Sequence, residues 1–313
     1  MPFTGKSGKF NASINTVEFG CGDKAVKIGG ENVFPLYSFD AAIENAPKVG
    51  IEITDFGMEH EPECIKKYYE GCATLADMAR KAASMEGVDF LSFRMEGGDP
   101  NGANKSTEEL IGELKEIADA VDLPLVVCGC KNVEKDAELF SKAAEALNGK
   151  NAVILSAKEE NYKTVGAAAG LAYKQVVGAE SAVDINLAKQ LNVLISQLGV
   201  DSKSVVMNVG TAAVGYGFEY VISTMDRVKA AALQQGDANL QMPIITPVAS
   251  EAWGVKEAMA SETDAPEWGS QEERGIDMEV ETAMAVIAAG SNAVILKHPE
   301  SIKIISGLMK ELV

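Results

Sequence analysis

Short apolar runs alternate with amphipathic segments along most of the chain, and their order predicts the fold. Continuously apolar runs predict buried strands at 49–56, 88–95, 124–130, 152–157, 176–181, 204–210, 242–248 and 292–298. The segments between and after them space their apolar residues at helical intervals and predict helices at 73–86, 106–121, 134–149, 161–175, 184–199, 218–234, 278–290 and 301–313. Such strands are typical of a parallel sheet that is covered on both faces.

Eight short strand–helix units in succession favour closure of this sheet into a (β/α)8 barrel. An open doubly wound sheet would instead place a glycine-rich phosphate-binding turn after an early strand. Residues 54–57, at the end of the first predicted strand, read Thr-Asp-Phe-Gly. The predicted fold is therefore an α/β protein, a TIM barrel.

The first 40 residues depart from the strand–helix pattern. Residues 15–20 and 25–30 are strand-like and flank a Cys-Gly-Asp-Lys turn, which predicts a β-hairpin. A two-stranded hairpin is not stable alone, so we expect it to lie across the domain that follows. The predicted organisation is a hairpin extension at 1–40 and a barrel at 41–313.

Composition and charge narrow the classes of function. The 313 residues are 47% hydrophobic and 24% charged, as in ordinary globular proteins. The formal net charge of −18 repels phosphate backbones, so a nucleic-acid partner is not expected. The N-terminus has no signal-peptide pattern, and no apolar run reaches the length of a membrane span. We therefore expect a cytoplasmic protein without membrane contact.

The cysteines and histidines argue against a metal centre held by this chain. Five cysteines are scattered, and Cys128 and Cys130 are too close for the usual Cys-x-x-Cys ligand pair. A four-thiolate iron–sulfur site is therefore not expected. Only two histidines, His60 and His298, are present, which excludes a three-histidine zinc site.

A barrel of this kind places its functional groups after the strands, at the C-terminal mouth. The residues that follow the predicted strands are rich in Asn, Ser, Thr, Gly and Tyr but poor in groups that start reactions. Five carboxylates there could include an acid/base pair, and the sequence does not show which of them converge. They are Asp55, Glu96, Asp99, Asp184 and Glu251.

Three residues at the mouth have a structural interpretation that is favoured over a chemical one. His298 follows the last predicted strand and is interpreted as bonded to backbone rather than as a general base. Asp184 is interpreted as a helix N-cap. Cys130 is interpreted as a buried, inert thiol rather than as a nucleophile or soft ligand.

Two glycine-rich segments indicate a ligand. Residues 97–104, Gly-Gly-Asp-Pro-Asn-Gly-Ala-Asn, predict a compact loop with exposed amides, or equally a tight βα turn. Residues 215–217, Gly-Tyr-Gly, allow close backbone approach beside a flat ring, or alternatively form a flexible loop with a packed tyrosine. Together they suit a large, flat ligand with polar edges rather than a metal ion or a bare phosphate.

One further segment has no regular pattern. Residues 261–275 predict a long acidic loop. Trp253 and Trp268 accompany this loop, where they could anchor a partner or pack into the core.

Seven sequence blocks, in the same order, resemble a known family. They are GGDPNGANKS (97–106), VCGCKNVEKD (127–136), ENYKTV (160–165), SAVDINLAKQLNVLI (181–195), GYGFEYVISTMDRVKAAALQ (215–234), MPIITPVASEAW (242–253) and LKHPES (296–301). In these blocks the chain is similar to the small subunit of the corrinoid iron–sulfur protein, which is the delta subunit of the acetyl-CoA decarbonylase/synthase complex.

The resemblance implies a barrel similar to pterin-binding methyltransferases, paired 1:1 with a large subunit that carries a [4Fe–4S] cluster and a cobamide-binding domain. The corrinoid would lie between that domain and the mouth of this barrel. The heterodimer would carry a methyl group from methyltetrahydrofolate, through a dedicated methyltransferase, to acetyl-CoA synthase/CO dehydrogenase in the reductive acetyl-CoA (Wood–Ljungdahl) pathway. Chemistry would occur at cobalt, so this subunit is expected to be non-catalytic and to supply position and environment.

The strand ends and the resemblance together give the residues expected nearest the corrinoid. They are Asp99, Asn101, Asn104, Gly129, Cys130, Asn161, Asp184, Asn186, Gly215, Tyr216 and Gly217. One departure from the family occurs where its members often have Asp-Pro and this chain has Asn208 and Val209. The alternative interpretation is a free-standing pterin-dependent methyltransferase, which would rest on the barrel type and on Asp55, Asp99 and Asn208.

Overall fold

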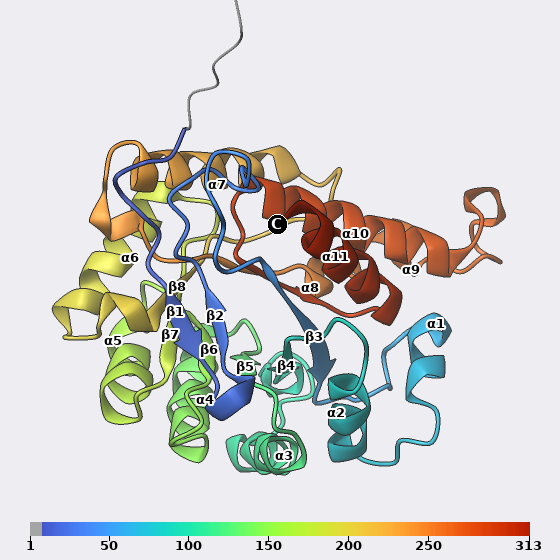
Figure 1. Ribbon diagram of the computed structural model, residues 1–313. Coiled ribbons are helices and arrows are strands. Elements are labelled where there is room, and N and C mark those ends of the chain that lie inside the picture. The colour runs from blue at the N-terminus through green and yellow to red at the C-terminus, as the bar shows by residue number, and fades with distance from the viewer. Residues whose placement is uncertain (1–7) are drawn as a thin grey trace, which may run out of the picture.

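A closed parallel sheet surrounded by helices forms the body of the protein in a computed structural model that describes residues 8–313 (Figure 1). The strand order is β8-β7-β6-β5-β4-β3-β10-β9. The strands are β3 (Lys48–Thr54), β4 (Phe90–Arg94), β5 (Leu125–Cys128), β6 (Val153–Ala157), β7 (Val176–Glu180), β8 (Val205–Asn208), β9 (Ile245–Pro247) and β10 (Ala293–Leu296). A parallel bridge between Met207 and Ile244 joins the two edges and closes the barrel. The predicted TIM barrel is confirmed.

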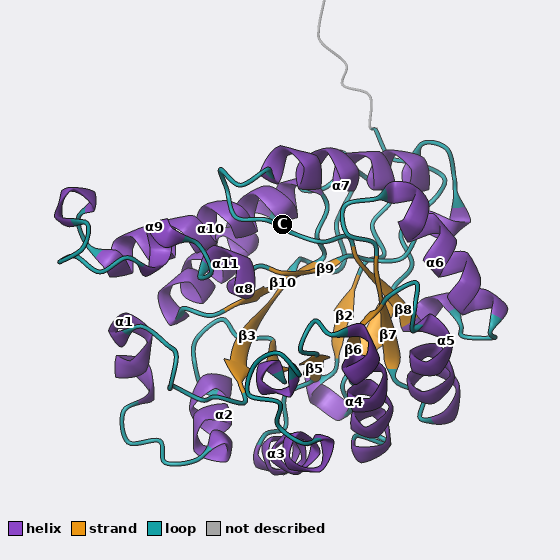
Figure 2. Ribbon diagram, turned by 180° about the vertical axis from the view of Figure 1, so that it is seen from behind, coloured by secondary structure: helices purple, strands orange, loops and turns teal. Residues whose placement is uncertain are grey.

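Helices alternate with the strands and lie outside them (Figure 2). The longer ones are α2 (Leu75–Ala83), α3 (Thr107–Ala120), α4 (Val133–Ala146), α6 (Ile185–Gln197), α7 (Phe218–Leu233), α10 (Gln271–Ala289) and α11 (Pro299–Leu312). Short helices α1 (Glu63–Lys66), α8 (Ala249–Ala252) and α9 (Lys256–Met259) lie in the connections after β3 and β9. Within the described residues, no helix combines the length and hydropathy of a membrane span.

The helix predicted at 161–175 is divided in the structure. A single α-helical turn, α5 (Tyr162–Val165), continues into a π-helical segment at Gly166–Ala172. This segment packs tightly, because a Cβ on Gly170 would lie 2.7 Å from Val200 Cγ2. Small residues are therefore required for the close approach, a constraint that helical periodicity does not reveal.

The helix predicted at 278–290 begins earlier than expected. Helix α10 starts at Gln271, because Ser270 Oγ accepts a hydrogen bond from the backbone N–H of Glu273 and caps the helix. The prediction of an acidic loop at 261–275 is therefore wrong for residues 271–275, which belong to α10. Acidic side chains in the first turn of α10 favour this start because they complement the helix dipole.

The two tryptophans near this segment differ in environment. Trp253 is buried and packs on Gly275, where a Cβ would lie 2.2 Å from Trp253 Cη2. Trp268 is 37% exposed, and Lys256 Nζ lies 5.2 Å from its ring centre. Core packing therefore describes Trp253, whereas Trp268 lies at the surface.

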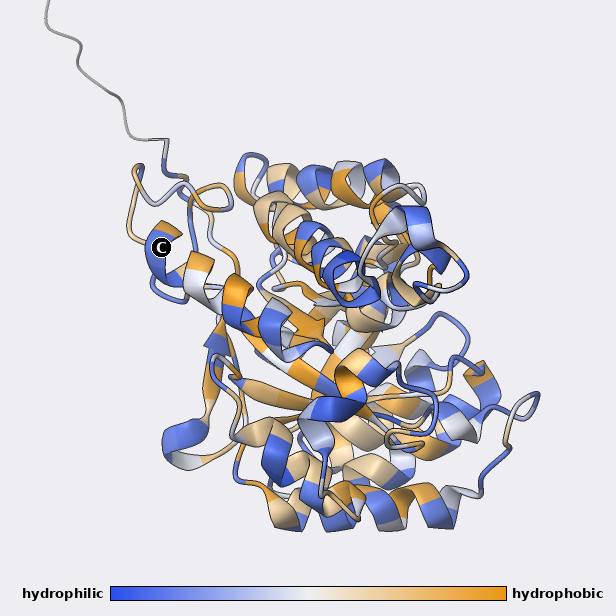
Figure 3. Cartoon of the chain, turned by 90° about the vertical axis from the view of Figure 1, so that its right-hand side faces the viewer, coloured by the Kyte–Doolittle hydropathy of each residue, from blue (hydrophilic) through white to orange (hydrophobic). Residues whose placement is uncertain are grey.

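The inward face of the barrel changes from apolar to polar along the strands. In β4, Leu91 and Phe93 pack toward the helices, whereas Phe90 belongs to the cluster inside the barrel. Ser92 and Arg94 follow Phe90 at alternate positions, so they share its inward face, and both are buried. Figure 3 shows the apolar strands enclosed by helices that carry hydrophilic residues. The polar end of the interior is the C-terminal mouth.

The N-terminal hairpin closes the opposite end of the barrel. Strands β1 (Val17–Phe19) and β2 (Val26–Ile28) pair antiparallel through a 3-10 turn at Gly22–Lys24. The apolar side chains of both strands join the interior cluster of the barrel. Phe19 meets Phe90 edge-on, with 5.5 Å between the ring centres. The predicted hairpin and its placement across the following domain are confirmed, and residues 1–7 of the predicted extension lie outside the described residues.

A buried polar network ties the segment after the hairpin to the barrel. Lys229 Nζ of α7 donates to Glu31 Oε1 at 2.8 Å and to Asn292 Oδ1 at 2.9 Å. Asn292 Nδ2 donates to the same Glu31 oxygen at 2.8 Å. Burial acts to raise the pKa of Glu31, but the charge and hydrogen bonds of Lys229 lower it overall. The carboxylate therefore depends on Lys229 for its charge compensation.

Candidate functional site

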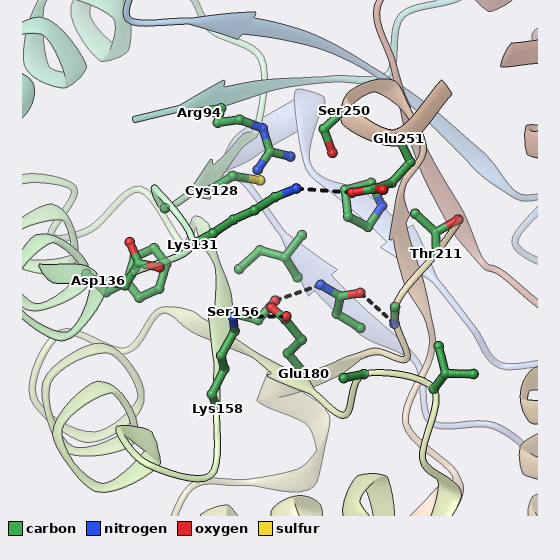
Figure 4. Close-up of a pocket in the computed structure, with 18 residues that line it drawn as sticks. Arg94, Cys128, Lys131, Asp136, Ser156, Lys158, Glu180, Thr211, Ser250 and Glu251 are labelled. Atoms are coloured by element: carbon green, nitrogen blue, oxygen red, sulfur yellow. Dashed lines mark hydrogen bonds and ion pairs between the residues drawn. The ribbon is translucent and has the colours of Figure 1, made fainter. Parts of the chain in front are cut away.

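Two adjoining hollows open at the C-terminal ends of the strands. The first, of about 300 Å³, touches the ends of β4 to β9 (Figure 4). The second, of about 440 Å³, touches the ends of β3, β4 and β10. Arg94, Gly129, Lys131 and Ser250 line both hollows. The two hollows therefore form one polar depression at the barrel mouth.

A buried ion pair forms part of the wall of this depression. Arg94 Nε donates to Glu52 Oε2 at 3.0 Å, and Arg94 Nη2 lies 2.8 Å from the same oxygen. Both side chains are at most 8% exposed. Burial acts to lower the pKa of Arg94, but the Glu52 carboxylate raises it well above its ordinary value. Arg94 is therefore a fixed cation at the mouth.

A second ion pair lies in the same hollow. Lys297, directly after β10, contacts Glu61 with 2.7 Å between Nζ and Oε1. Burial acts to lower the pKa of Lys297, but Glu61 and Glu52 raise it overall. The second hollow is thus lined by two ion pairs, in each of which the cation is balanced by a carboxylate.

The remaining lysines that line the depression are also paired with acids. Lys131 Nζ lies 3.1 Å from Glu251 Oε1, and Lys158 Nζ lies 3.3 Å from Glu180 Oε1. Figure 4 shows these pairs on opposite sides of the first hollow. The mouth therefore carries many charges, but little of the positive charge is left unpaired to bind a phosphate group.

Asn208 makes two hydrogen bonds within the protein. Its Nδ2 donates to Ser156 Oγ at 3.0 Å, and its Oδ1 accepts from the backbone N–H of Gly210 at 3.1 Å (Figure 4). An aspartate at this position could not supply the amide donor. Asn208 therefore fixes the ends of β6 and β8 relative to each other.

Cys130 is held by a neighbouring carboxylate rather than exposed for reaction. Its backbone N–H donates to Asp136 Oδ1 at 2.7 Å, and its Sγ donates to the same oxygen at 3.2 Å. A Cβ on Gly129 would lie 2.2 Å from this oxygen, so only glycine permits the contact. Burial and the Asp136 charge raise the pKa of the Cys130 thiol to about 12. This geometry supports the interpretation as an inert thiol.

We predict that Cys130 reacts slowly with iodoacetamide in the native protein at pH 8. The thiolate is the reactive form, and a pKa of about 12 leaves almost none of it. Exposed Cys21 is the internal reference and should be alkylated first. Peptide mass spectrometry over a time course measures both sites. Equal alkylation rates at Cys21 and Cys130 would contradict the interpretation.

His298 has a structural environment, as the sequence interpretation expected. Its Nδ1 accepts from the backbone N–H of Glu300 and caps α11, and Nε2 lies 3.4 Å from Glu272 Oε1. The ring is fully buried and stacks on Trp253 with 5.8 Å between ring centres. Burial lowers the pKa of His298, and Lys67, which pairs with Glu272, acts in the same direction.

We predict that His298 makes the protein less stable below about pH 6.5. Its pKa is depressed in the folded state, so the unfolded chain binds the proton more readily and stability is lost as pH falls. Glu272 and Glu300 oppose this effect, because both favour the charged ring. Urea midpoints at pH 7.5 and 5.5 should show a smaller pH effect for His298→Asn than for wild type. His60→Asn, at an exposed position, should behave as wild type.

Several residues expected near a corrinoid do lie at the depression. Asp99 lines the second hollow together with Gly129 and Cys130. Asn101 and Asn104 are exposed in the loop after β4, where Asp99 Oδ1 accepts the backbone N–H of Asn101 at 2.9 Å. The loop at 97–104 is thus a compact turn that also borders the second hollow.

The other expected residues lie outside the two hollows. Asn161 is buried and bonds the backbone of Lys158 and Val133, so its amide is used structurally. Asp184 caps α6 by accepting from Asn186 and Leu187, and Asn186 is exposed. The structure does not bring these three residues into contact with the depression.

The Gly-Tyr-Gly segment lies at the start of α7. Tyr216 is 50% exposed, and its hydroxyl donates to Glu257 Oε2 of α9 at 2.5 Å. Gly215 and Gly217 both have positive φ angles, of 88° and 80°. These backbone conformations favour glycine. The two glycines are therefore explained by the turn itself, without contact between the segment and a ligand. Gly215 lines a separate surface hollow beside α7.

Sequence reasoning did not select Glu52, Arg94 and Glu180, because each belongs to a strand interpreted as a continuous apolar run. A signal was present in the alternation of residues along these strands. Ser92 and Arg94 are polar at every second position, as are Glu52 and Thr54. Alternating polar positions inside an apolar strand indicate side chains that point into the barrel near its mouth.

The described residues contain no group of three or more His, Cys, Asp or Glu side chains placed to hold a metal ion. Cys128 and Cys130 are buried, Cys64 and Cys72 are half-buried, and Cys21 is exposed. The mouth offers hydrogen-bonding groups, among them the Arg94 guanidinium and the Ser250 hydroxyl. This arrangement suits an organic ligand with polar substituents.

The fold belongs to the class of barrels that includes dihydropteroate synthases. The Xanthomonas albilineans enzyme in complex with 7,8-dihydropteroate superposes with a TM-score of 0.56 at 12% sequence identity, covering 94% of this chain and 98% of that one. Dihydropteroate synthase from Thermus thermophilus gives a TM-score of 0.54 at 13% identity, covering 95% of this chain and 100% of that one. At such low identity these likenesses concern the fold alone.

Sequence comparison identifies the family. The family model described as CO dehydrogenase/acetyl-CoA synthase delta subunit matches residues 16–309, so the chain belongs to this family. Acetyl-CoA decarbonylase/synthase complex subunit delta of Methanopyrus kandleri is 33% identical over 293 residues, which cover 93% of this chain and 71% of that protein. Subunit delta 1 of Methanosarcina thermophila is 30% identical over 296 residues, covering 92% of this chain. The chain spans 66% of the Methanosarcina protein, just under two thirds of its length.

Proposed function

We propose that this chain is the small subunit of a corrinoid iron–sulfur protein, a methyl carrier between a methyltetrahydrofolate:corrinoid methyltransferase and acetyl-CoA synthase. Its barrel, residues 41–313, would cover a cobamide held jointly with a large subunit in a cytoplasmic 1:1 heterodimer. Residues 1–40 would be a structural extension, and the [4Fe–4S] cluster would belong to the large subunit. Family membership over residues 16–309 supports this assignment.

One observation carries the proposal: the buried carboxylates of the mouth are already bonded within the protein. Asp55 accepts from the backbone N–H of Gly97 at 2.9 Å and pairs with Lys105 at 3.1 Å. Asp136 binds Cys130, and Glu52 binds Arg94. A general base must reach a substrate proton, which Asp55 and Asp136 cannot do without losing these partners. The mouth therefore supplies an environment rather than an acid or a base.

The same contacts disfavour a free-standing pterin-dependent methyltransferase. That alternative assigned roles to Asp55, Asp99 and Asn208. Asp55 and Asn208 are engaged by Lys105 and Ser156 in the interior. Asp99 and Asn208 border the hollows, but Asp99 Oδ1 accepts from Asn101, and Asn208 is bonded to Ser156 and Gly210.

The residues of the mouth fit the edge of a corrinoid. When bound, the corrinoid supplies the cobalt that accepts and releases the methyl group. Arg94 and Ser250 offer hydrogen-bonding groups to amide substituents. Paired charges at the rim hold these groups in place before a ligand arrives, which lowers the cost of binding.

Reconstitution with the large subunit tests the proposed function. The isolated chain should remain colourless after incubation with cobamide and gel filtration. Mixed with the large subunit, it should form a stable 1:1 complex that retains one corrinoid, measured by absorbance and light scattering. The large subunit alone is the control and should retain the corrinoid less well. Stoichiometric cobamide binding by the isolated chain would contradict the proposal, and saturable methyltetrahydrofolate binding in calorimetry would favour the alternative.

A further inference from the structure

Glu52 and Arg94 leave one side of their ion pair open. Both Arg94 Nε and Nη2 contact the same carboxylate oxygen, Glu52 Oε2. Arg94 Nη2 makes no hydrogen bond of ordinary geometry, but it lies 2.8 Å from this oxygen and is covered by protein. Among residues 8–313, neither Arg94 Nη1 nor Glu52 Oε1 has a hydrogen-bond partner either. The pair therefore presents unused donors beside an unused acceptor.

Arg94 Nη1 and Glu52 Oε1 are the atoms of the pair that a ligand in the second hollow can reach, because Arg94 Nη2 is covered by protein. Glu52 and Arg94 both line this hollow, and Arg94 also lines the first. Ser250 lines both hollows as well, and its hydroxyl has no protein partner among the described residues. Figure 4 shows the Arg94 guanidinium and the Ser250 side chain at the same part of the mouth. A short polar substituent would therefore meet donors and an acceptor together.

Donors on Arg94 beside an acceptor on Glu52 select one functional group in a ligand. A primary carboxamide has an oxygen that accepts from the guanidinium and an NH2 that donates to a carboxylate. A carboxylate would match the Arg94 donors but would place an oxygen against Glu52 Oε1. The charges around the second hollow also disfavour a carboxylate, because the positive charges of Lys297 and Arg94 are each balanced by an acid. Glu96, which also lines the hollow, is exposed and adds negative charge.

We propose that Glu52 and Arg94 bind one peripheral carboxamide of the corrinoid and select it against a carboxylate. This inference rests on the proposed function, because a cobamide carries primary carboxamides around its ring. Glu52 accepts from the amide NH2, and Arg94 donates to the amide oxygen. The pair is a specificity-determining contact, and the Lys297–Glu61 pair keeps its surroundings neutral.

The test compares cyanocobalamin with its monoacids, in each of which one peripheral propionamide is replaced by propionate. Affinities for the complex of this chain with the large subunit are measured by equilibrium dialysis at pH 7.5. One monoacid should bind at least about tenfold more weakly than cyanocobalamin. Its propionate would place a negatively charged oxygen against Glu52 Oε1, where the amide NH2 would donate a hydrogen bond. This comparison uses the wild-type complex and does not depend on the folding of any variant.

A variant of this chain assigns the discrimination to Glu52. In Glu52→Gln the side chain can present an NH2 donor to the propionate of the monoacid. The loss of affinity of that monoacid relative to cyanocobalamin should therefore shrink to about threefold or less. Glu18→Gln makes the same change on the hairpin, at the opposite end of the barrel, and should leave the penalty intact. Circular dichroism confirms that both variants are folded.

Three outcomes would overturn the inference. If every monoacid binds as tightly as cyanocobalamin, no carboxamide is selected, although the proposed function stands. If the penalty is unchanged in Glu52→Gln, the selecting residue lies elsewhere, and again only the inference fails. If the wild-type complex binds no cyanocobalamin at all, the proposed function and the inference fail together.

Discussion

Replacing Lys229 by methionine is expected to destabilise the protein by about 3–5 kcal/mol. Lys229 is 1% exposed, and its ammonium group compensates the buried Glu31 carboxylate at 2.8 Å. Methionine fills most of the space but leaves the carboxylate without a cation. Glu31 retains only the amide of Asn292 as a side-chain donor. Urea unfolding followed by circular dichroism measures the loss from the shift in midpoint.

The double variant Lys229→Met/Glu31→Gln separates charge compensation from packing. A neutral side chain at position 31 removes the uncompensated charge, so a substantial part of the lost stability should return. Lys27→Met is the matched control, because Lys27 and its partner Glu18 are both exposed. An exposed ion pair contributes about 0–1 kcal/mol. Equal effects of Lys27→Met and Lys229→Met would contradict the role assigned to the network.

Most of the architecture could be predicted from the order of apolar and amphipathic segments. Each predicted strand from 49–56 to 292–298 overlaps an observed one, because burial on both faces leaves a continuous apolar run. The exceptions arise where local contacts override periodicity. Ser270 starts α10 within a segment whose acidity resembled a loop. Gly170 permits a π-helical turn where periodicity predicts an α-helix.

The candidate site was predictable only in part, because its pairs are formed by closure of the barrel. Lys297 and Glu61 are 236 positions apart in the sequence, and nothing local to either residue indicates the partner. The loop at 97–104 was found because its glycines and Asp99 are adjacent in sequence. Arg94 was missed because its strand was read as apolar throughout, although its alternation with Ser92 indicated the inward face.

The arrangement of charge explains how a very acidic protein can hold cations at its polar mouth. Acids outnumber bases by 46 to 28 in the chain, yet the buried cations at the mouth, Arg94 and Lys297, each have an acid partner. Pairing holds both cations in the charged form and fixes their positions. Groups fixed in this way can orient a ligand without exchanging protons with it.

Replacing Phe19 by alanine is expected to destabilise the protein by about 3–5 kcal/mol. Phe19 is fully buried where the hairpin closes the base of the barrel, edge-on to Phe90. Alanine would lose the transfer free energy of the ring and leave a cavity. Phe90 packs so closely on Gly50 that a Cβ on Gly50 would lie 2.1 Å from Phe90 Cε2. Because this packing holds the Phe90 ring in place, we expect the ring not to move into the cavity.

Phe39→Ala is the matched control for this prediction, because Phe39 is 78% exposed and should cost less than about 0.5 kcal/mol. Urea midpoints of the two variants against wild type measure the difference. The mouth lies at the other end of the barrel, so the folded fraction of Phe19→Ala should bind the proposed large subunit and corrinoid as wild type does. An effect of Phe19→Ala no larger than that of Phe39→Ala would show that the hairpin does not seal the base of the barrel, because an exposed ring has no cavity to leave.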